Sequence, residues 1–214
     1  MVVCWSVGGG VGVSVVSAAL ALTAMHAGEP VVVIDLGGDQ PVLFGAADPP
    51  GPGVAEWTRS GPEVGGAALG RLEAELVPGI SLLPRGSGPL DPARAEELAR
   101  WADDGDRFVV VDAGPAVADG FAEALVRASA RTLLVARACP LSLRRIEQLA
   151  VRPTEVVVVR DRRRAVAWHQ VADAAGAPVV AELEIDPMVA AAVDAGLERR
   201  ALPRRFLRVV DGVR

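Results

Sequence analysis

A glycine-rich stretch near the start of the chain, SVGGGVGVS at 6–14, has the composition of a phosphate-binding turn. Such a turn uses glycines because backbone N–H groups must converge on the anion, and a Ser or Thr opening the next helix can bind Mg²⁺. A Lys that contacts the β and γ phosphates normally precedes that residue, but Val13 stands before Ser14. The candidate nucleotide contacts in this stretch are Gly9, Gly10, Gly12, Val13 and Ser14.

The stretches around this loop predict alternating strands and helices. Residues 2–5 and 31–36 are apolar, as strands buried on both faces of a parallel sheet are, and an alanine-rich helical run at 15–24 lies between them. Further strands are predicted at 72–77, 80–83, 108–112, 132–136, 155–160 and 178–183, and helices at 54–59, 92–101, 119–128, 139–149, 162–175 and 185–196. We expect Asp91 to cap helix 92–101 and Ser142 to cap helix 139–149. The pattern predicts a single-domain α/β fold, with a mostly parallel twisted sheet and helices on both faces.

The segment GGGVGVS at 8–14 resembles the deviant Walker A loop of the ParA/MinD family, whose pattern is Lys-Gly-Gly-x-Gly-Lys-Ser/Thr. Gly8 and Val13 replace the two family lysines, while the matching positions are Gly9, Gly10, Gly12 and Ser14. In that family the first lysine reaches across a nucleotide-sandwich dimer and the second contacts the phosphates of its own subunit. The resemblance implies a P-loop NTPase fold of the ParA/MinD type with a degenerate loop.

Two carboxylates also resemble family motifs. Asp35 matches the first residue of the family's Asp-x-Asp motif, whereas Gly37 stands where the second carboxylate would lie near Mg²⁺ and the attacking water. Asp112, at the end of FVVVD, resembles the Walker B aspartate. By this resemblance Ser14 and Asp112 would hold Mg²⁺ if a Mg-nucleotide binds, and Asp35 would complete a vestigial nucleotide site.

The resemblance continues along most of the chain. Val159 or Arg160 takes the place of the Asn that the family uses beside adenine. Further similar segments are ISLLPRG at 80–86, PLSLR at 140–144 and IDPMVAAAVDAG at 185–196. We therefore assign 1–197 to one degenerate ParA/MinD-like domain. An eroded P-loop also resembles the CpaE/TadZ branch, which implies a positioning factor for Tad-type pilus assembly.

Composition limits the partners. The 214 residues carry a formal net charge of -5 and all 22 basic residues are Arg, so the acidic balance argues against nucleic acid as a partner.

Cys4 and Cys139 are too few for a disulfide framework and are predicted to be buried reduced thiols of a cytoplasmic protein. Residues 1–28 carry no charged side chain, but they lack a basic start and contain the glycine cluster, so we assign them to the domain.

Two basic segments leave alternatives open. The run from Arg160 to Arg164 follows a predicted strand, where it either binds an anion or lies solvated on a loop. The tail 198–214, ERRALPRRFLRVVDGVR, is basic and amphipathic and resembles, in position, the membrane-binding tail of MinD. It either docks on its own domain or binds a membrane surface.

Taken with the resemblance, these features predict a non-hydrolysing pseudo-ATPase that acts as a spatial-positioning or assembly scaffold. Hydrolysis is expected to be lost because Gly8, Val13 and Gly37 stand in place of three functional groups. The expected partners are proteins of a secretion, pilus or division apparatus and a second copy of the chain, in the cytoplasm or at the inner face of the membrane. No cofactor is required. A weak ATP/Mg²⁺-binding switch without turnover and a DNA-binding partition protein stay open as alternatives.

Overall fold

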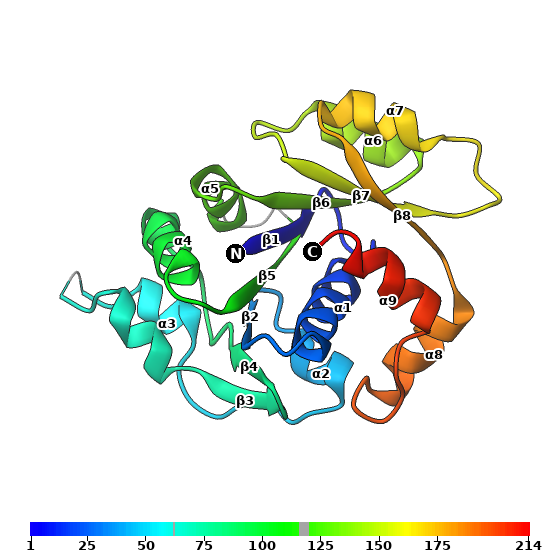
Figure 1. Cartoon of the computed structure of the whole chain (residues 1–214). Helices are drawn as coiled ribbons and strands as arrows, with labels where there is room; N and C mark the ends of the chain where they lie inside the picture. The colour runs from blue at the N-terminus through cyan, green and yellow to red at the C-terminus, as the bar shows by residue number, and fades with distance from the viewer. Residues whose placement is uncertain (62, 116–119) are drawn as a thin grey trace.

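An eight-stranded sheet forms the centre of the molecule (Figure 1). In this computed structural model, which describes residues 1–61, 63–115 and 120–214, the strand order is β3-β4-β2-β5-β1-β6-β7-β8. β3 runs antiparallel to β4, and all other neighbours are parallel. The strands are β1 (Val2–Ser6), β2 (Val31–Asp35), β3 (Ala74–Val77), β4 (Ile80–Leu83), β5 (Phe108–Pro115), β6 (Thr132–Arg137), β7 (Glu155–Arg160) and β8 (Val179–Glu184). The predicted α/β fold is confirmed.

Helices cover both faces of the sheet and bury two separate apolar layers (Figure 1). One layer lies under α3 (Val54–Thr58), α4 (Ala95–Asp103), α5 (Phe121–Ala128), α6 (Pro140–Glu147) and α7 (Trp168–Ala175). The other lies under α1 (Val13–His26), α2 (Gln40–Phe44), α8 (Pro187–Ala195) and α9 (Arg204–Asp211). Short 3₁₀ turns span Gly66–Arg71 and Pro92–Arg94.

The central strand β1 shows why the sequence has continuous apolar runs. Its five residues are all buried, with Val3 and Trp5 in the layer under α3 to α7 and Val2 and Cys4 in the layer under α1. Successive side chains of a strand point to opposite faces, so a strand covered on both sides needs apolar residues at every position. The predicted burial of Cys4 is confirmed.

The predicted helix at 162–175 is wrong in its first half, because α7 spans only Trp168–Ala175. Asp161 Oδ1 accepts the backbone N–H of Arg163 at 3.0 Å, and this local turn competes with a helical start. The start of the helix predicted at 119–128 lies outside the described residues, and the remainder is α5.

Ser142 does not cap α6, contrary to prediction. The N-cap is Cys139 and the helix begins at Pro140, a residue suited to the first turn because it needs no backbone N–H there. Ser142 is buried inside the helix with its Oγ 3.3 Å from Cys139 Sγ. The predicted burial of Cys139 is wrong, because at the helix start its side chain is only partly buried. Asp91 does act as a cap, accepting the N–H of Ala93 at 3.0 Å.

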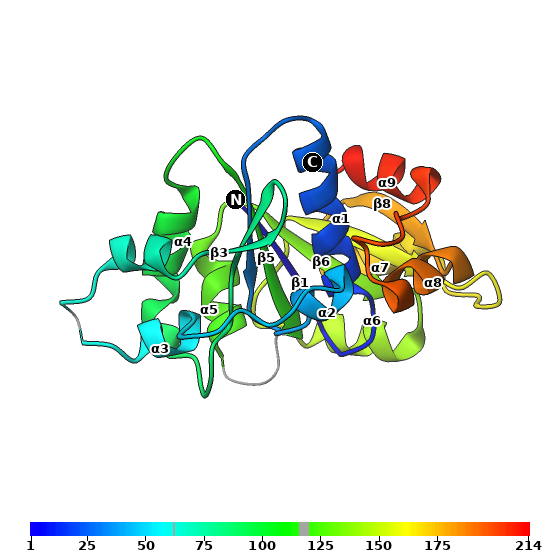
Figure 2. The same ribbon diagram turned by 90° about the horizontal axis from the view of Figure 1, so that it is seen from below.

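The C-terminal tail docks on its own domain. α9 lies beside α1 (Figure 2) and buries Phe206 and Val210 against it, while Arg205 pairs with Asp186 at 2.6 Å. Within the part of the chain that the structure describes, no helix is long and apolar enough to span a membrane. Lipid binding by the tail therefore stays a prediction.

Candidate functional site

The glycine-rich loop joins β1 to α1 at the carboxyl edge of the sheet. Gly10 and Gly12 have φ of 69° and 97°, in the left-handed region that favours glycine. Gly12 is the N-cap of α1, and Val13 opens the helix with its side chain buried in the apolar layer. Ser14 follows in the first turn and is half-buried, and Gly9 is exposed. The structure thus contains the predicted turn, and a buried valine occupies the position directly before Ser14.

Strand register brings the two predicted carboxylates to this edge. Asp35, the last residue of β2, lies directly opposite Asp112 of β5. Their exposed fractions are 1% and 0%, so both carboxyls are enclosed by protein. The side chain of Ser14 hydrogen-bonds to Asp112. The loop and the two strand ends therefore form one buried polar cluster.

Gln40, which the sequence did not single out, connects this cluster. Its Nε2 donates to Asp112 Oδ2 at 2.7 Å and to the backbone oxygen of Ser14 at 3.0 Å. Its backbone N–H donates to Asp35 Oδ2 at 2.9 Å. The Gln40 side chain is fully buried, and its Oε1 has no hydrogen-bond partner among the described residues. The one signal in the sequence was its place five residues after Asp35, in the segment that follows that strand.

Burial dominates the charge state of the two carboxyls. It raises the pKa of Asp35 to about 6, the charge of Asp112 adds to this, and hydrogen bonds from the backbones of Gln40 and Gly38 oppose it. Burial also raises the pKa of Asp112, against hydrogen bonds from Gln40 and Ser14. No ion pair to either carboxyl is found within 1–61, 63–115 and 120–214. The cluster is therefore poor in positive charge.

The cluster does not fit Mg²⁺ in this arrangement. Mg²⁺ requires near-octahedral oxygen ligands, but Asp112 faces the amide N–H of Gln40, a donor that repels a cation. The other Asp112 oxygen accepts the N–H of Gly114 at 3.2 Å. In the described residues no group of three or more His, Cys, Asp or Glu could hold a metal ion. Ser14 and Asp112 are neighbours, but Gln40 would have to move before they could share a metal.

Two arginines lie against the glycine-rich loop. Arg137, at the end of β6, donates from Nη2 to the backbone oxygen of Gly10 at 2.6 Å. The guanidinium of Arg145, in α6, fills the space that a Cβ at Gly8 would occupy. The sequence offered one signal for Arg137, its place at the carboxyl end of a strand, and none for Arg145. Positive charge therefore does reach the loop, from elsewhere in the same chain.

A carboxylate also lies near the position of Gly37. A Cβ built on Gly37 would lie 3.8 Å from Asp39 Oδ2 and 3.6 Å from Asp35 Oδ1. Asp39 comes two residues later in the chain, and the turn at Gly38, with φ of 85°, returns its side chain toward the strand end. The sequence comparison, made position by position, missed this carboxylate.

An apolar cleft of about 290 Å³ adjoins the loop on the side of α8 and α9. Val159, at the end of β7, lines this cleft, whereas Arg160 pairs with Glu182 at 3.5 Å. Other lining residues are Gly12, Val15, Val16, Val189 and Phe206. The residue facing the cleft from β7 is thus a valine, which cannot hydrogen-bond to a base.

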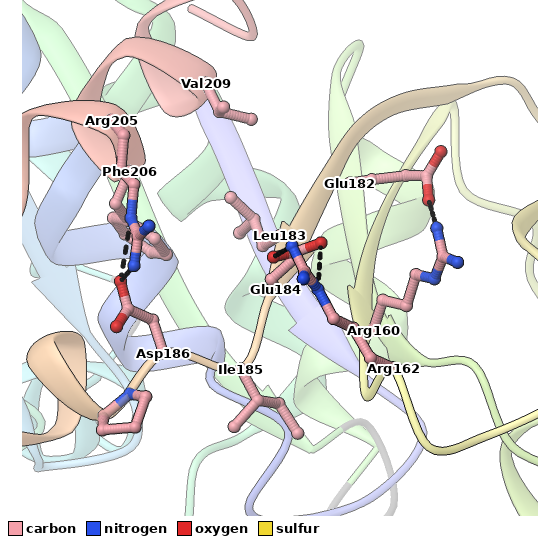
Figure 3. A pocket seen from close by; sticks show the side chains of 11 residues that line it. Arg160, Arg162, Glu182, Leu183, Glu184, Ile185, Asp186, Arg205, Phe206 and Val209 are labelled. Atoms are coloured by element: carbon pink, nitrogen blue, oxygen red, sulfur yellow. Dashed lines mark hydrogen bonds and ion pairs between the residues drawn. The ribbon is translucent and has the colours of Figure 1, made fainter.

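The basic run after β7 is engaged in ion pairs. Figure 3 shows two of these ion pairs, together with a third pair made by α9, around a pocket of about 630 Å³ between the end of β8 and α9. The pairs are Arg160 with Glu182 (3.5 Å), Arg162 with Glu184 (2.7 Å) and Arg205 with Asp186 (2.6 Å). Arg163 pairs with Asp161 at 2.9 Å. An anion in this pocket would compete with carboxylates already in place.

The fold is that of ParA/MinD ATPases. A ParA family ATPase from Chlorobium tepidum superposes with a TM-score of 0.79 at 16% identity, covering 100% of this chain and 97% of the other. MinD in the MinC:MinD cell division complex of Aquifex aeolicus superposes with a TM-score of 0.77 at 17% identity, covering 99% of this chain and 93% of the other. MinD of Pyrococcus horikoshii with Mg-ADP superposes with a TM-score of 0.74 at 15% identity, covering 99% of this chain and 94% of the other. No family profile and no curated protein sequence matches the chain.

Proposed function

We propose that this chain is a ParA/MinD-like protein that does not hydrolyse ATP and acts as a spatial-positioning or assembly scaffold. The observation that carries the proposal is the hydrogen bond from Gln40 Nε2 to Asp112 Oδ2, because it sets an amide donor on the carboxylate that a metal would need. The loop itself supplies no cation, since Val13 is buried and the chain contains no Lys. Phosphoryl transfer depends on neutralising charge at the transferring group, so this arrangement disfavours turnover.

The proposed partners are proteins of a secretion, pilus or division apparatus, with a CpaE/TadZ-like role in Tad-type pilus localisation as the specific form. Support for a protein-binding role comes from fold neighbours such as MinD, which was solved in complex with MinC. A homodimer through the loop face would rest on apolar contact, and Ile185, which is 52% exposed and lines the cleft beside Gly12, offers such contact. The proposed location is the cytoplasm, at the inner face of the membrane if α9 contacts lipid.

Turnover is tested by phosphate release from Mg-ATP, measured for the wild type and for Asp112→Ala. We expect both proteins to release phosphate no faster than a control of Mg-ATP in buffer without protein. Circular dichroism checks that each protein is folded. Magnesium-dependent release that Asp112→Ala abolishes would refute the proposal. The scaffold role is tested by a fluorescent fusion, whose localisation should be the same with Asp112→Asn as with the wild type.

A weak ATP-binding switch without turnover is the second candidate. Arg137 and Arg145 at the loop favour it, since they bring positive charge to the place where phosphates bind in this fold. Titration calorimetry with ATP, with and without Mg²⁺, separates it from a scaffold that needs no nucleotide. The DNA-binding alternative lacks such support, because the basic run after β7 is paired with carboxylates.

A further inference from the structure

The outer edge of β8 carries open backbone groups. β8 ends the sheet order and pairs with β7. The N–H of Ile185 donates to the backbone oxygen of Arg160 at 3.1 Å, and Arg160 lies opposite Glu184 in the register. The backbone groups of successive strand residues point alternately to the two sides of the strand, so those of Glu182 and Glu184 point away from β7. No hydrogen bond to these groups is found within 1–61, 63–115 and 120–214. The edge of β8 can therefore pair with a further strand.

A groove runs along this edge, between β8 and α9 (Figure 3). It is the pocket of about 630 Å³ described above, and its lining includes Glu182 and Leu183 of β8 and Phe206 and Val209 of α9. Consecutive side chains of a strand point to opposite faces of the sheet. A pocket that contacts both Glu182 and Leu183 therefore reaches around the edge of the strand, where the open backbone groups lie.

The lining of the groove suits an extended peptide. A peptide that adds a strand to a sheet edge gains main-chain hydrogen bonds, and every second side chain enters a pocket beside the edge. Leu183 and Phe206 are buried apolar residues of the lining, and Val209 is 41% exposed. An apolar side chain of the peptide would therefore have apolar atoms to contact in the groove.

The charge beside the groove favours an acidic peptide. The three arginines that line the groove are each paired with a carboxylate. Arg204 and Arg208 are exposed on α9 and adjoin the lining residues Arg205 and Val209 in the sequence. In the part of the chain that the structure describes, neither Arg204 nor Arg208 has a carboxylate partner. An acidic peptide would therefore gain two cations without breaking an ion pair.

We propose that the edge of β8 binds an extended, acidic segment of a partner protein, which adds a strand to the sheet and places an apolar side chain beside Val209. The backbone groups of Glu182 and Glu184 pair with the segment, and Arg204 and Arg208 attract its carboxylates. The inference goes beyond the scaffold proposal, which assigns no surface to a partner other than a second copy. It requires neither a nucleotide nor the glycine-rich loop.

The probe is a fluorescein-labelled peptide of alternating valine and glutamate, with a length of 6 residues like β8. Fluorescence anisotropy measures its binding to the full chain, and a peptide of alternating valine and lysine is the charge control. The acidic peptide should bind at least about tenfold more tightly, because its carboxylates complement Arg204 and Arg208. Amide exchange followed by NMR should show that the N–H groups of Glu182 and Glu184 become protected as the peptide binds.

Glu182→Pro tests the open edge directly. It removes an N–H that points outward, so the pairing with β7 is kept, and it should weaken binding about tenfold or more. Glu182→Gln is the matched control, because it removes the same charge and the same ion pair with Arg160 but keeps the N–H. It should bind within about threefold of the wild type. Val209→Asp adds a negative charge to the groove without changing the backbone, so it should weaken binding even if Glu182→Pro does not fold.

Absence of binding at millimolar peptide overturns the inference. Equal binding by Glu182→Pro and Glu182→Gln, or by Val209→Asp and the wild type, overturns it as well. A wild-type dimer that Glu182→Pro converts to a monomer in analytical ultracentrifugation would also overturn it, because a second copy would then cover the edge. Each of these results leaves the scaffold proposal standing, whereas Mg-ATP turnover would refute the scaffold and not this edge.

Discussion

Asp35 and Asp112 lie opposite each other across β2 and β5, both are buried, and neither has a cationic partner in the part of the chain that the structure describes. A carboxylate pair in this setting is costly to ionise, because desolvation and mutual repulsion act in the same direction. The hydrogen bonds of Gln40 to both residues offset part of that cost. Stability at neutral pH therefore depends on the hydrogen bonds that Gln40 makes within this cluster.

Replacing Asp35 should change how stability depends on pH. The pKa of Asp35 is about 6 in the folded protein against an ordinary 3.8, so its contribution is fully present below pH 4 and is lost as pH rises through 6. The asparagine side chain of Asp35→Asn does not titrate. The free energy of unfolding of this variant, relative to that of the wild type, should therefore rise by roughly 2–3 kcal/mol between pH 4 and pH 7. Urea unfolding of both proteins across this range measures the difference. A difference that stays constant with pH would contradict the prediction.

Truncating Gln40 should destabilise the fold. Gln40→Ala leaves the buried Asp112 carboxyl without its closest donor at 2.7 Å, at a cost of roughly 1–3 kcal/mol. Gln148→Ala is the control, because Gln148 is exposed at the end of α6 and its change should stay within about 0.5 kcal/mol. Chemical denaturation compares the free energies of unfolding. Equal decreases in the free energy of unfolding for the two variants would contradict a stabilising role for the Gln40 side chain.

An alanine at Gly12 should cost about 1–2 kcal/mol, because φ is 97° there and a Cβ makes that conformation unfavourable. Gly9→Ala in the same loop should be nearly neutral, since Gly9 has no positive φ and a Cβ would meet no atom within 4 Å. Thermal unfolding of the two variants distinguishes them. If both are neutral, the loop adopts another conformation in solution.

Removal of the Phe206 side chain should release α9 from α1. Phe206 is 9% exposed, and Phe206→Ala should cost roughly 3 kcal/mol of docking energy. Val209→Ala is the control on the same helix, with Val209 at 41% exposure and little contact to lose. Limited proteolysis should cleave the first variant before α9 and leave the second intact. Identical cleavage patterns would mean that the helix is not held by this contact.

Local pattern was sufficient for most of the fold. Strands covered on both faces leave uninterrupted apolar runs in the sequence, and the boundaries of β4 and β7 followed from these runs directly. Helix starts were less predictable where side chains compete with the backbone. The Asp161 turn delayed α7, and the N-cap of α6 is Cys139 where Ser142 was predicted, although the helix begins within one residue of its predicted start.

The candidate site was predicted only in part. Aligning a motif position by position identifies substitutions within that motif, but it does not identify residues that reach the site from elsewhere in the chain. Ser14, Asp35 and Asp112 come together as the alternation of strands implies. Arg137 and Arg145 reach the loop from sequence separations of more than 120 residues, which no local pattern can reveal. Gln40 is similar, since its role depends on the tertiary contact with Asp112.

The partly buried thiol of Cys139 has an unusual consequence, since the sequence contains neither Lys nor Tyr. Burial opposes ionisation of the Cys139 thiol, but hydrogen bonds from Ser142 and Leu141 outweigh burial and hold the pKa of Cys139 below 9.0. Burial raises the pKa of the Cys4 thiol to about 12. Guanidinium groups keep their protons throughout this range. In an alkaline titration, the absorbance of the thiolate would therefore report the ionisation of Cys139 with little contribution from other side chains. This absorbance can be used to monitor the start of α6, the helix that carries Arg145.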